Sequence, residues 1–412
     1  MRSLTAGICG GLLFAAAPAF AGNVDQKLLD MLLANGSITA AQHDELTTDL
    51  AKEQTSAASS SDVAALEKKL DWALKTQLKG DMRVRYETVH IEDLPDTKDQ
   101  DRQRIRARLG AYTQINPEVD TGIRIASGSS NDARSTNQSL DGYFTKKDLW
   151  LDMAYIDFHP EAVPGLHLTG GKIAQPWKSV GDVIWDGDIN PEGGAAIYST
   201  DLGGAQLFGS AGYFVLKDNV DGNGTQFKHD LRLYSGQIGT SFAPVENVKM
   251  MVGGSIYAYD NANNSPSGSG FLIANGNTTD QFRLYEAFGQ VDFSGLPVPL
   301  SLYGQYVKNG AARGVDADQD QAWLVGFMTK LFDIGLDYNY RDVQRNGVAG
   351  GYTDSDFAYG FTGSRGHKIK AKYEISKNFA FVATYFMAKS DAASVTHDAS
   401  VNTLQVDLEA KF

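Results

Sequence analysis

The chain has 412 residues, of which 42% are hydrophobic, and a formal net charge of −13 at pH 7. This acidic balance argues against nucleic-acid binding, which needs a basic surface. The single cysteine is Cys9, so the chain beyond residue 21 can form no internal disulfide, and 43 glycines with 20 phenylalanines and 18 tyrosines favour β-structure rich in turns.

The first 21 residues have the pattern of a secretory signal peptide. Arg2 precedes an apolar stretch, and residues 19–21 form an A-x-A cleavage site. The apolar stretch is broken and shorter than the ~20 residues that a membrane-spanning helix needs. We therefore expect cleavage after Ala21 and export of the remaining chain.

Residues 22–78 form a helical segment that differs in pattern from the rest. DQKLLDMLLANGSITAAQHDELTTDL (25–50) predicts two short helices, with Gly36 ending the first and Ser37 or Thr39 capping the second. A Ser-rich linker follows, and then apolar residues at heptad spacing: Val63, Leu66, Leu70 and Ala73. This last part is either a surface helix beside the next domain or a short oligomerising coiled coil.

Residues 79–412 show a period of two instead of 3.6. Met82, Val84 and Tyr86 alternate with charged residues, and the closing LQVDLEAKF has the same pattern. We count about sixteen such segments, joined in alternation by seven short and eight long polar connections. This pattern predicts an all-β transmembrane protein, an antiparallel closed β-barrel of about 16 strands, because only a closed sheet gives every backbone group a partner in lipid.

Aromatic residues near the predicted strand ends fit the girdles that such barrels place at the membrane interfaces. They are Tyr155, Phe158, Tyr257, Tyr259, Phe293 and Tyr385. The alternative is that these residues form the core of a soluble sandwich, although eight long polar loops are unusual in a compact soluble domain.

Four segments carry a resemblance to a known family: LLANGSITAAQHDEL, the short helix before KGDMRVRYE, the GGKIAQPW strand, and LQVDLEAKF. With them the chain resembles a Gram-negative outer-membrane porin of the sixteen-stranded type, in particular the putative porin family related to phosphate-selective porins. The resemblance implies passive diffusion of small hydrophilic solutes and ions, a homotrimer in outer-membrane lipid and lipopolysaccharide, and a periplasmic N-terminal segment. It also implies that Phe412 is the signal read by the barrel assembly machinery.

Strand parity identifies basic side chains that face the predicted lumen. They are Arg83, Arg85, Arg104, Arg106, Arg108, Arg124, Lys368, Lys370 and Lys372. The third long loop is acidic, with Asp182, Asp186, Asp188 and Glu192. In the general porins this loop folds inward and faces a basic wall, so the resemblance implies a pore constriction between the two sets. The alternatives are solvated acids at the pore mouth, and arginines paired with wall acids such as Asp407 and Glu409.

The sequence predicts no cofactor, no metal site and no enzymatic activity. DGNG (221–224) and DADQD (316–320) lack the full ligand spacing of a calcium loop. The seven histidines form no metal-type pair at helical spacing, and no serine motif accompanies them.

Three functions remain open on this basis. The first is a general diffusion porin, which the acidic third loop favours. The second is an anion- or phosphate-selective channel, which the dense basic residues favour because arginine suits phosphate geometrically. The third is a structural barrel that holds a partner protein.

Overall fold

The computed structural model describes residues 21–56, 72–92, 99–262, 275–391 and 398–412. The predicted signal peptide, apart from Ala21, and most of the candidate coiled coil lie outside these residues. The chain divides into two units, Met1–Leu74 and Lys75–Phe412, which are described separately.

The first unit contains the two predicted helices, α1 (Ala21–Ala34) and α2 (Ala40–Ser56). Gly36 ends α1 with a positive φ of 73°, and Thr39 starts α2 with a reciprocal cap, in which its hydroxyl accepts from the Gln42 amide at 3.3 Å. His43 Nε2 lies 2.9 Å from Asp30 Oδ1 and joins the two helices. None of the described helices is long and apolar enough to cross a membrane.

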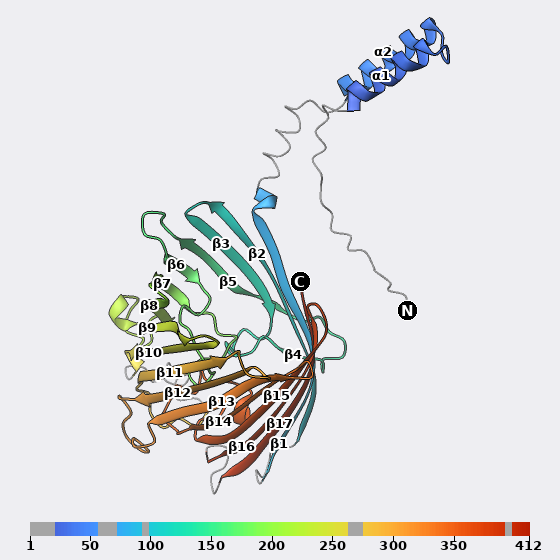
Figure 1. Cartoon of the computed structure of the whole chain (residues 1–412). Coiled ribbons are helices and arrows are strands. Elements are labelled where there is room, and N and C mark those ends of the chain that lie inside the picture. The colour runs from blue at the N-terminus through green and yellow to red at the C-terminus, as the bar shows by residue number, and fades with distance from the viewer. Residues whose placement is uncertain (1–20, 57–71, 93–98, 263–274, 392–397) are drawn as a thin grey trace. The chain divides into compact units, whose positions relative to one another are not determined.

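The second unit is a closed antiparallel barrel (Figure 1). Its strands are β1 (Thr76–Ile91), β2 (Gln100–Asn116), β3 (Val119–Ser127), β5 (Leu149–Phe158), β6 (Leu166–Lys172), β7 (Glu192–Leu202), β8 (Ala205–Lys217), β9 (Leu231–Val245), β10 (Val248–Asp260), β11 (Arg283–Phe293), β12 (Leu300–Asn309), β13 (Gln321–Leu331), β14 (Ile334–Val343), β15 (Ser364–Ser376), β16 (Phe379–Ser390) and β17 (Ala399–Lys411). Each pairs with the next, and β1 pairs with both β2 and β17, which closes a ring of sixteen strands. A two-residue strand, β4 (Gln138–Ser139), lies outside this ring and pairs with β2.

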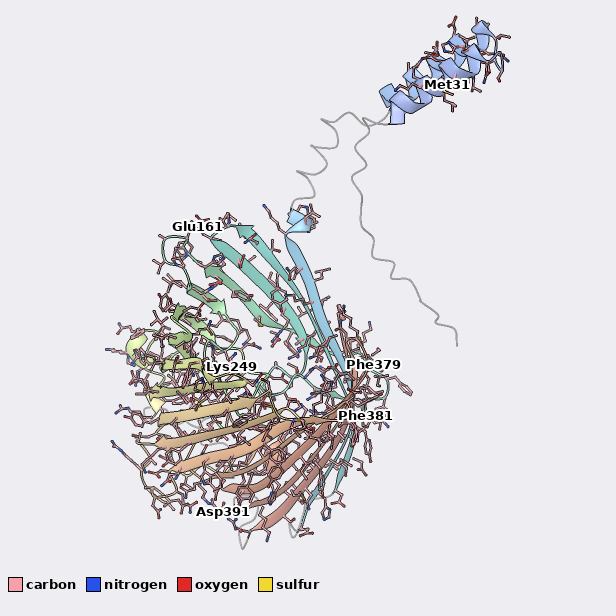
Figure 2. All side chains as sticks on the ribbon, in the orientation of Figure 1. Met31, Glu161, Lys249, Phe379, Phe381 and Asp391 are labelled. Atoms are coloured by element: carbon pink, nitrogen blue, oxygen red, sulfur yellow. The ribbon has the colours of Figure 1, made fainter. Side chains whose placement is uncertain are left out.

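The predicted barrel architecture is therefore confirmed, with a small difference at its start. β1 begins at Thr76, within the segment that the sequence assigned to helix, and not at Lys79. Short and long connections alternate as expected, so they gather at opposite ends of the barrel. Figure 2 labels one residue of each kind, Glu161 in a short turn and Asp391 in a long loop. Two of the long loops contain short 3₁₀ helices, η1 (Phe227–His229) and η3 (Phe357–Gly360).

Alternate residues face the two sides of the barrel wall. On β1 and β17, Val84 and Leu408 are 53% and 44% exposed on the outside, whereas Arg85 and Asp407 are 4% and 3% exposed on the inside. Phe379 and Phe381 lie exposed on the outer face of β16 (Figure 2). An apolar outer face toward lipid and a polar inner face are what a membrane barrel requires.

The predicted aromatic girdle is wrong at two positions. Tyr257 and Tyr259 face inward, and Tyr257 is only 1% exposed. Both side chains pack in an internal apolar cluster because the third long loop covers them, which the alternation of β10 by itself did not reveal.

A lysine on the outer face tests the membrane-facing surface. Val325 lies in the middle of β13 and Leu331 at its end, and both side chains are exposed. We expect Val325→Lys to lower the free energy of unfolding by about 2–4 kcal/mol and Leu331→Lys by about 0–1 kcal/mol, because a charge costs most at the bilayer midplane. Denaturant unfolding of the refolded barrel in lipid vesicles measures both, and equal costs at the two positions would contradict this orientation.

Candidate functional site

The third long loop, L3 (residues 173–191), packs its apolar side chains against the inner wall of the barrel. Trp177 and Trp185 lie with ring centroids 5.2 and 5.3 Å from that of Tyr257 on β10. Val183 and Ile184 are fully covered by the same cluster. The wall residues of this cluster come from the strands between β7 and β14: Ala195, Phe214, Leu231, Leu233, Tyr257, Leu284, Tyr303, Val307, Ala322, Leu324 and Val343.

A side-chain clamp adds to this packing. Gln237 of β9 accepts a hydrogen bond from the Lys178 amide at 2.7 Å and donates one to the Lys178 carbonyl at 2.8 Å. Both backbone groups of one loop residue are thus satisfied by one buried amide, which fixes the loop on the wall rather than leaving it at the mouth.

A second loop, L7 (residues 344–363), lies against L3. The Asp186 amide donates to the Tyr352 carbonyl at 2.7 Å, and the Thr353 hydroxyl donates to the Val183 carbonyl at 2.7 Å. The Asp186 carboxylate in turn accepts from the Ser355 amide at 2.9 Å. The acidic side of L3 is therefore joined by further acids from L7, Asp354 and Asp356.

Arginines of β1 and β2 form the opposite side, and most of them are paired with wall acids. Arg85 makes a bidentate contact with Asp407, at 2.7 and 2.9 Å. Arg106 and Arg108 share the two oxygens of Asp81, at 2.8 and 2.7 Å. The ion-paired ladder that the sequence left open is thus present.

Ion pairs also cross from the loops to the wall. Asp182 of L3 lies 2.9 Å from Lys368 of β15 and 2.6 Å from Arg341 of β14. Asp188 lies 3.2 Å from Arg108, and Asp356 of L7 lies 3.2 Å from Arg85.

Between the loops and the wall lies a cavity of about 280 Å³. Six basic and seven acidic side chains line it: Arg83, Arg85, Arg106, Arg134, Lys368 and Lys370, with Asp182, Asp186, Asp188, Asp354, Asp356, Asp407 and Glu409. Among the described residues, Lys370 has no carboxylate within ion-pair distance, which distinguishes it from Lys368.

The remaining residues of the predicted basic and acidic sets do not line this cavity directly. Arg108 borders this cavity through Asp188, and Arg104 lines a neighbouring one with Glu87. Arg124 binds Asp152 at 2.5 Å.

Two predicted residues are separated from the group. Lys372 pairs with Glu374 at 3.0 Å near the end of β15, and Glu192 pairs with Lys172 at 2.7 Å at the start of β7. Neither side chain lines the cavity. Glu192 is a strand residue because the loop ends at Pro191, one position earlier than its acidic run suggested.

Sequence reasoning missed four charged residues of the cavity and its border. Arg341 is 1% exposed and holds both Asp182 and Asp354, the latter at 3.1 Å. Arg134 comes from the loop between β3 and β5, and Asp354 and Asp356 come from L7. Strand parity alone would have identified Arg341 as an inward-facing residue. The loop residues Arg134, Asp354 and Asp356 reach the cavity only through tertiary contacts, which strand parity does not predict.

Burial and neighbouring charges separate the acids of the loops. Burial next to Asp182 raises the pKa of Asp354 to about 6, and burial beside Asp354 and Asp188 raises the pKa of Asp186 well above its usual value. At Asp182 burial acts in the same direction, but the charges of Arg341 and Lys368 outweigh it and hold the pKa below its usual value. These acids therefore differ in charge at mildly acidic pH.

Asp354→Asn tests this difference. Between about pH 4 and 6 the folded protein holds a proton on Asp354 that the unfolded chain releases, so this residue lowers stability as pH rises through the window. We expect the wild type to lose up to about 3 kcal/mol of unfolding free energy relative to Asp354→Asn between pH 4 and 7. Denaturant unfolding across this range measures the difference. Asp333→Asn, in an exposed turn, is the control, and parallel profiles for wild type and Asp354→Asn would contradict the assignment.

Comparison with known proteins identifies a family to which this chain is similar over most of its length. The model of a family described as "Putative porin" matches residues 94–291 and 279–412. A curated relative, Phosphate starvation-inducible protein 1 of Pseudomonas fluorescens, is 64% identical over 31 residues, which are 8% of this chain and 80% of that protein.

Solved structures of mutant Rhodopseudomonas blastica porins are also similar. A triple mutant matches with a TM-score of 0.45 and 9% identity, and covers 82% of this chain and 100% of its own. A mutant with several alanine substitutions matches over the same shares, with a TM-score of 0.46 and 9% identity.

Proposed function

The chain belongs to the putative porin family. We propose that the cavity between L3, L7 and the basic wall is the constriction of a diffusion channel rather than an enzyme's active site. Small hydrophilic solutes and ions would pass it without a conformational cycle. Its selectivity would depend on the charges that line this narrow section.

The observation that carries the proposal is the separation of charge across the cavity. Asp182, Asp186 and Asp188 come from L3, whereas the arginines of β1 and β2 and the lysines of β15 come from the barrel wall. L3 and the barrel wall thus carry opposite charges on rigid supports, with direct contacts at Asp182–Lys368 and Asp188–Arg108, and this distribution produces a field across the channel axis. Such a field favours dipolar and hydrated solutes over apolar ones.

The near balance of charge favours a general channel over one specific for phosphate. Acids slightly outnumber bases along the cavity, and most of the arginines already have carboxylate partners. A phosphate would have to displace these carboxylates to obtain arginine hydrogen bonds.

Phosphate selectivity is the second candidate, and two observations favour it. The 31-residue match is to a protein whose name refers to phosphate starvation. Lys370 also offers the cavity a basic group that is free of ion pairs among the described residues.

Family resemblance supports further proposals about assembly and location. We infer a homotrimer in outer-membrane lipid and lipopolysaccharide, with the helices α1 and α2 in the periplasm. We also infer that Phe412 is the signal for the barrel assembly machinery. Its backbone pairs with Gly80 through two 3.0 Å hydrogen bonds, and the residue is 62% exposed, so the aromatic end is accessible.

Lys370→Gln tests the basic wall, with Lys372→Gln on the same strand as the matched control. Lys370 lines the cavity, whereas Lys372 is paired with Glu374 outside it. We expect Lys370→Gln to lower the anion-to-cation permeability ratio by about fivefold, because one charge at contact range changes ion energies by roughly 1 kcal/mol in water. Reversal potentials of single channels under a salt gradient measure the ratio.

The outcomes separate the candidate functions. Equal shifts in the two variants would show that this cavity does not set selectivity. Block of the wild type by low phosphate concentrations would replace the general channel with a phosphate-selective one. A folded barrel without conductance would exclude both and leave a barrel that holds a partner protein.

A further inference from the structure

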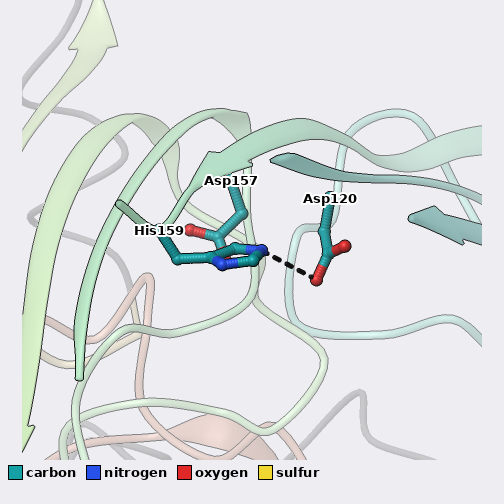
Figure 3. Close-up of side chains that lie close together, drawn as sticks. All are labelled: Asp120, Asp157 and His159. Atoms are coloured by element: carbon teal, nitrogen blue, oxygen red, sulfur yellow. Dashed lines mark ion pairs between the residues drawn. The ribbon is translucent and has the colours of Figure 1, made fainter. Parts of the chain in front are cut away.

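A second cluster of titratable residues lies at the end of the barrel where the short turns gather. Asp120 is near the start of β3, Asp157 is near the end of β5, and His159 is in the turn after β5 (Figure 3). The cluster is separate from the cavity described above, which none of its members lines. Asp120 is distant in sequence from Asp157 and His159, and the register between β3 and β5 brings the three residues together.

The register places two carboxylates directly opposite each other. Asp120 pairs with Asp157 across β3 and β5, and Asp120 lies on the same face of β3 as Arg124. Like charges at directly opposed positions destabilise a sheet unless something compensates them. His159 lies beside Asp120, with Nε2 3.3 Å from Asp120 Oδ2.

The two turns that carry the cluster are tied together, so its geometry is held by the fold. The His159 amide donates to the Glu118 carbonyl at 2.8 Å, and the Glu161 amide donates to the Glu118 carboxylate at 2.9 Å. Asp120 and His159 each lie within two residues of these bonds.

The neighbouring strand β6 orients one of the carboxylates. Thr169 donates a hydrogen bond to Asp157 Oδ1 at 3.0 Å, and His167 Nδ1 lies 2.7 Å from Asp157 Oδ2. Supporting contacts of this kind hold ligating carboxylates in metal sites.

Two atoms of the cluster are screened from solvent without a hydrogen bond to any described residue. They are Asp120 Oδ1 and His159 Nε2. Shielded polar atoms are nearly always satisfied, by protein, water or an ion. Asp120 Oδ1 has no hydrogen-bond partner among the described residues, and His159 Nε2 has only its 3.3 Å ion-pair contact with Asp120 Oδ2, so these atoms point to an additional ligand.

We propose that Asp120, Asp157 and His159 bind a divalent transition-metal ion, with Zn²⁺ as the best match. One ligand atom from each of the three residues lies within 4.8 Å of the others. Tetrahedral ligands about 2.0–2.1 Å from zinc are about 3.4 Å apart, so a small contraction suffices. One imidazole and two carboxylates suit zinc, whereas Ca²⁺ needs six to eight oxygens, and Mg²⁺ prefers oxygen ligands.

The bound ion would neutralise the opposed carboxylates and crosslink the two turns, with His167 and Thr169 as positioning residues. Three protein ligands leave a fourth position for water, which makes the site exchangeable rather than closed. This site does not depend on the constriction proposed above, because binding and conduction are measured separately.

The test is calorimetric titration of the refolded, chelator-treated full chain with ZnCl₂. We expect one Zn²⁺ per chain with micromolar affinity, weakened at least about tenfold by His159→Gln or Asp120→Asn and about tenfold by His167→Ala. His229→Gln is the matched control, because His229 Nδ1 lies 2.7 Å from Asp221 but belongs to no group of three ligands among the described residues. Titration with MgCl₂ should show no binding at this site.

Unchanged zinc affinity in a folded His159→Gln or Asp120→Asn chain would overturn the proposal. So would the absence of zinc binding to the folded wild type. Heat-modifiable migration in gels verifies folding of each variant, and having two independent ligand variants keeps the test valid if one fails to fold.

Discussion

The requirement that every strand edge in lipid be hydrogen-bonded governs this structure, and the pairing of β1 with β17 is what satisfies it. This closing pair joins residues from the two ends of the second unit, so that Arg85 lies opposite Asp407. Because β15 and β16 follow around the ring, Lys368 and Lys370 reach the same region of the inner wall. The basic wall is thus a consequence of closure, assembled from segments about as far apart as this unit allows.

Closure also creates an interior in which L3 lies between an apolar part and a charged part of the inner wall. The inner wall from β7 to β14 is apolar where the tryptophans of L3 pack, and the wall of β1, β2, β15 and β17 is charged. L3 has an apolar side, which packs on the apolar wall, and an acidic side, which faces the charged wall. Hydrophobic burial therefore anchors the loop while its carboxylates meet the opposite wall. L7 reinforces this position through main-chain bonds to Asp186 and Val183. The arrangement explains how a loop with several acids remains inside the barrel.

Ion pairing decides how much of this charge is available to a solute. Arg85, Arg106 and Arg108 are dense in sequence, but their guanidinium groups are already bound to Asp407 and Asp81. Arg341 is buried and forms ion pairs with Asp182 of L3 and Asp354 of L7. The density of arginine in this barrel sequence therefore overstates the number of guanidinium groups that are free to bind an anion, because wall acids in register take up the same hydrogen bonds.

Local periodicity and loop chemistry were enough to derive the barrel, its strand count, the alternation of short and long connections and the inward parity of Arg83 and Arg85, because a strand in a membrane wall must alternate at every position. The same reasoning placed Tyr257 and Tyr259 in an interface girdle and grouped Glu192 and Lys372 with the cavity, since it had no information on depth or on loop packing. The sequence by itself determined the barrel architecture and the inward parity of the basic residues on β1, β2 and β15. Only the tertiary structure decided which side chains meet, such as Asp182 with Arg341 or Asp120 with Asp157 and His159, because register and loop docking bring together residues that no local pattern connects.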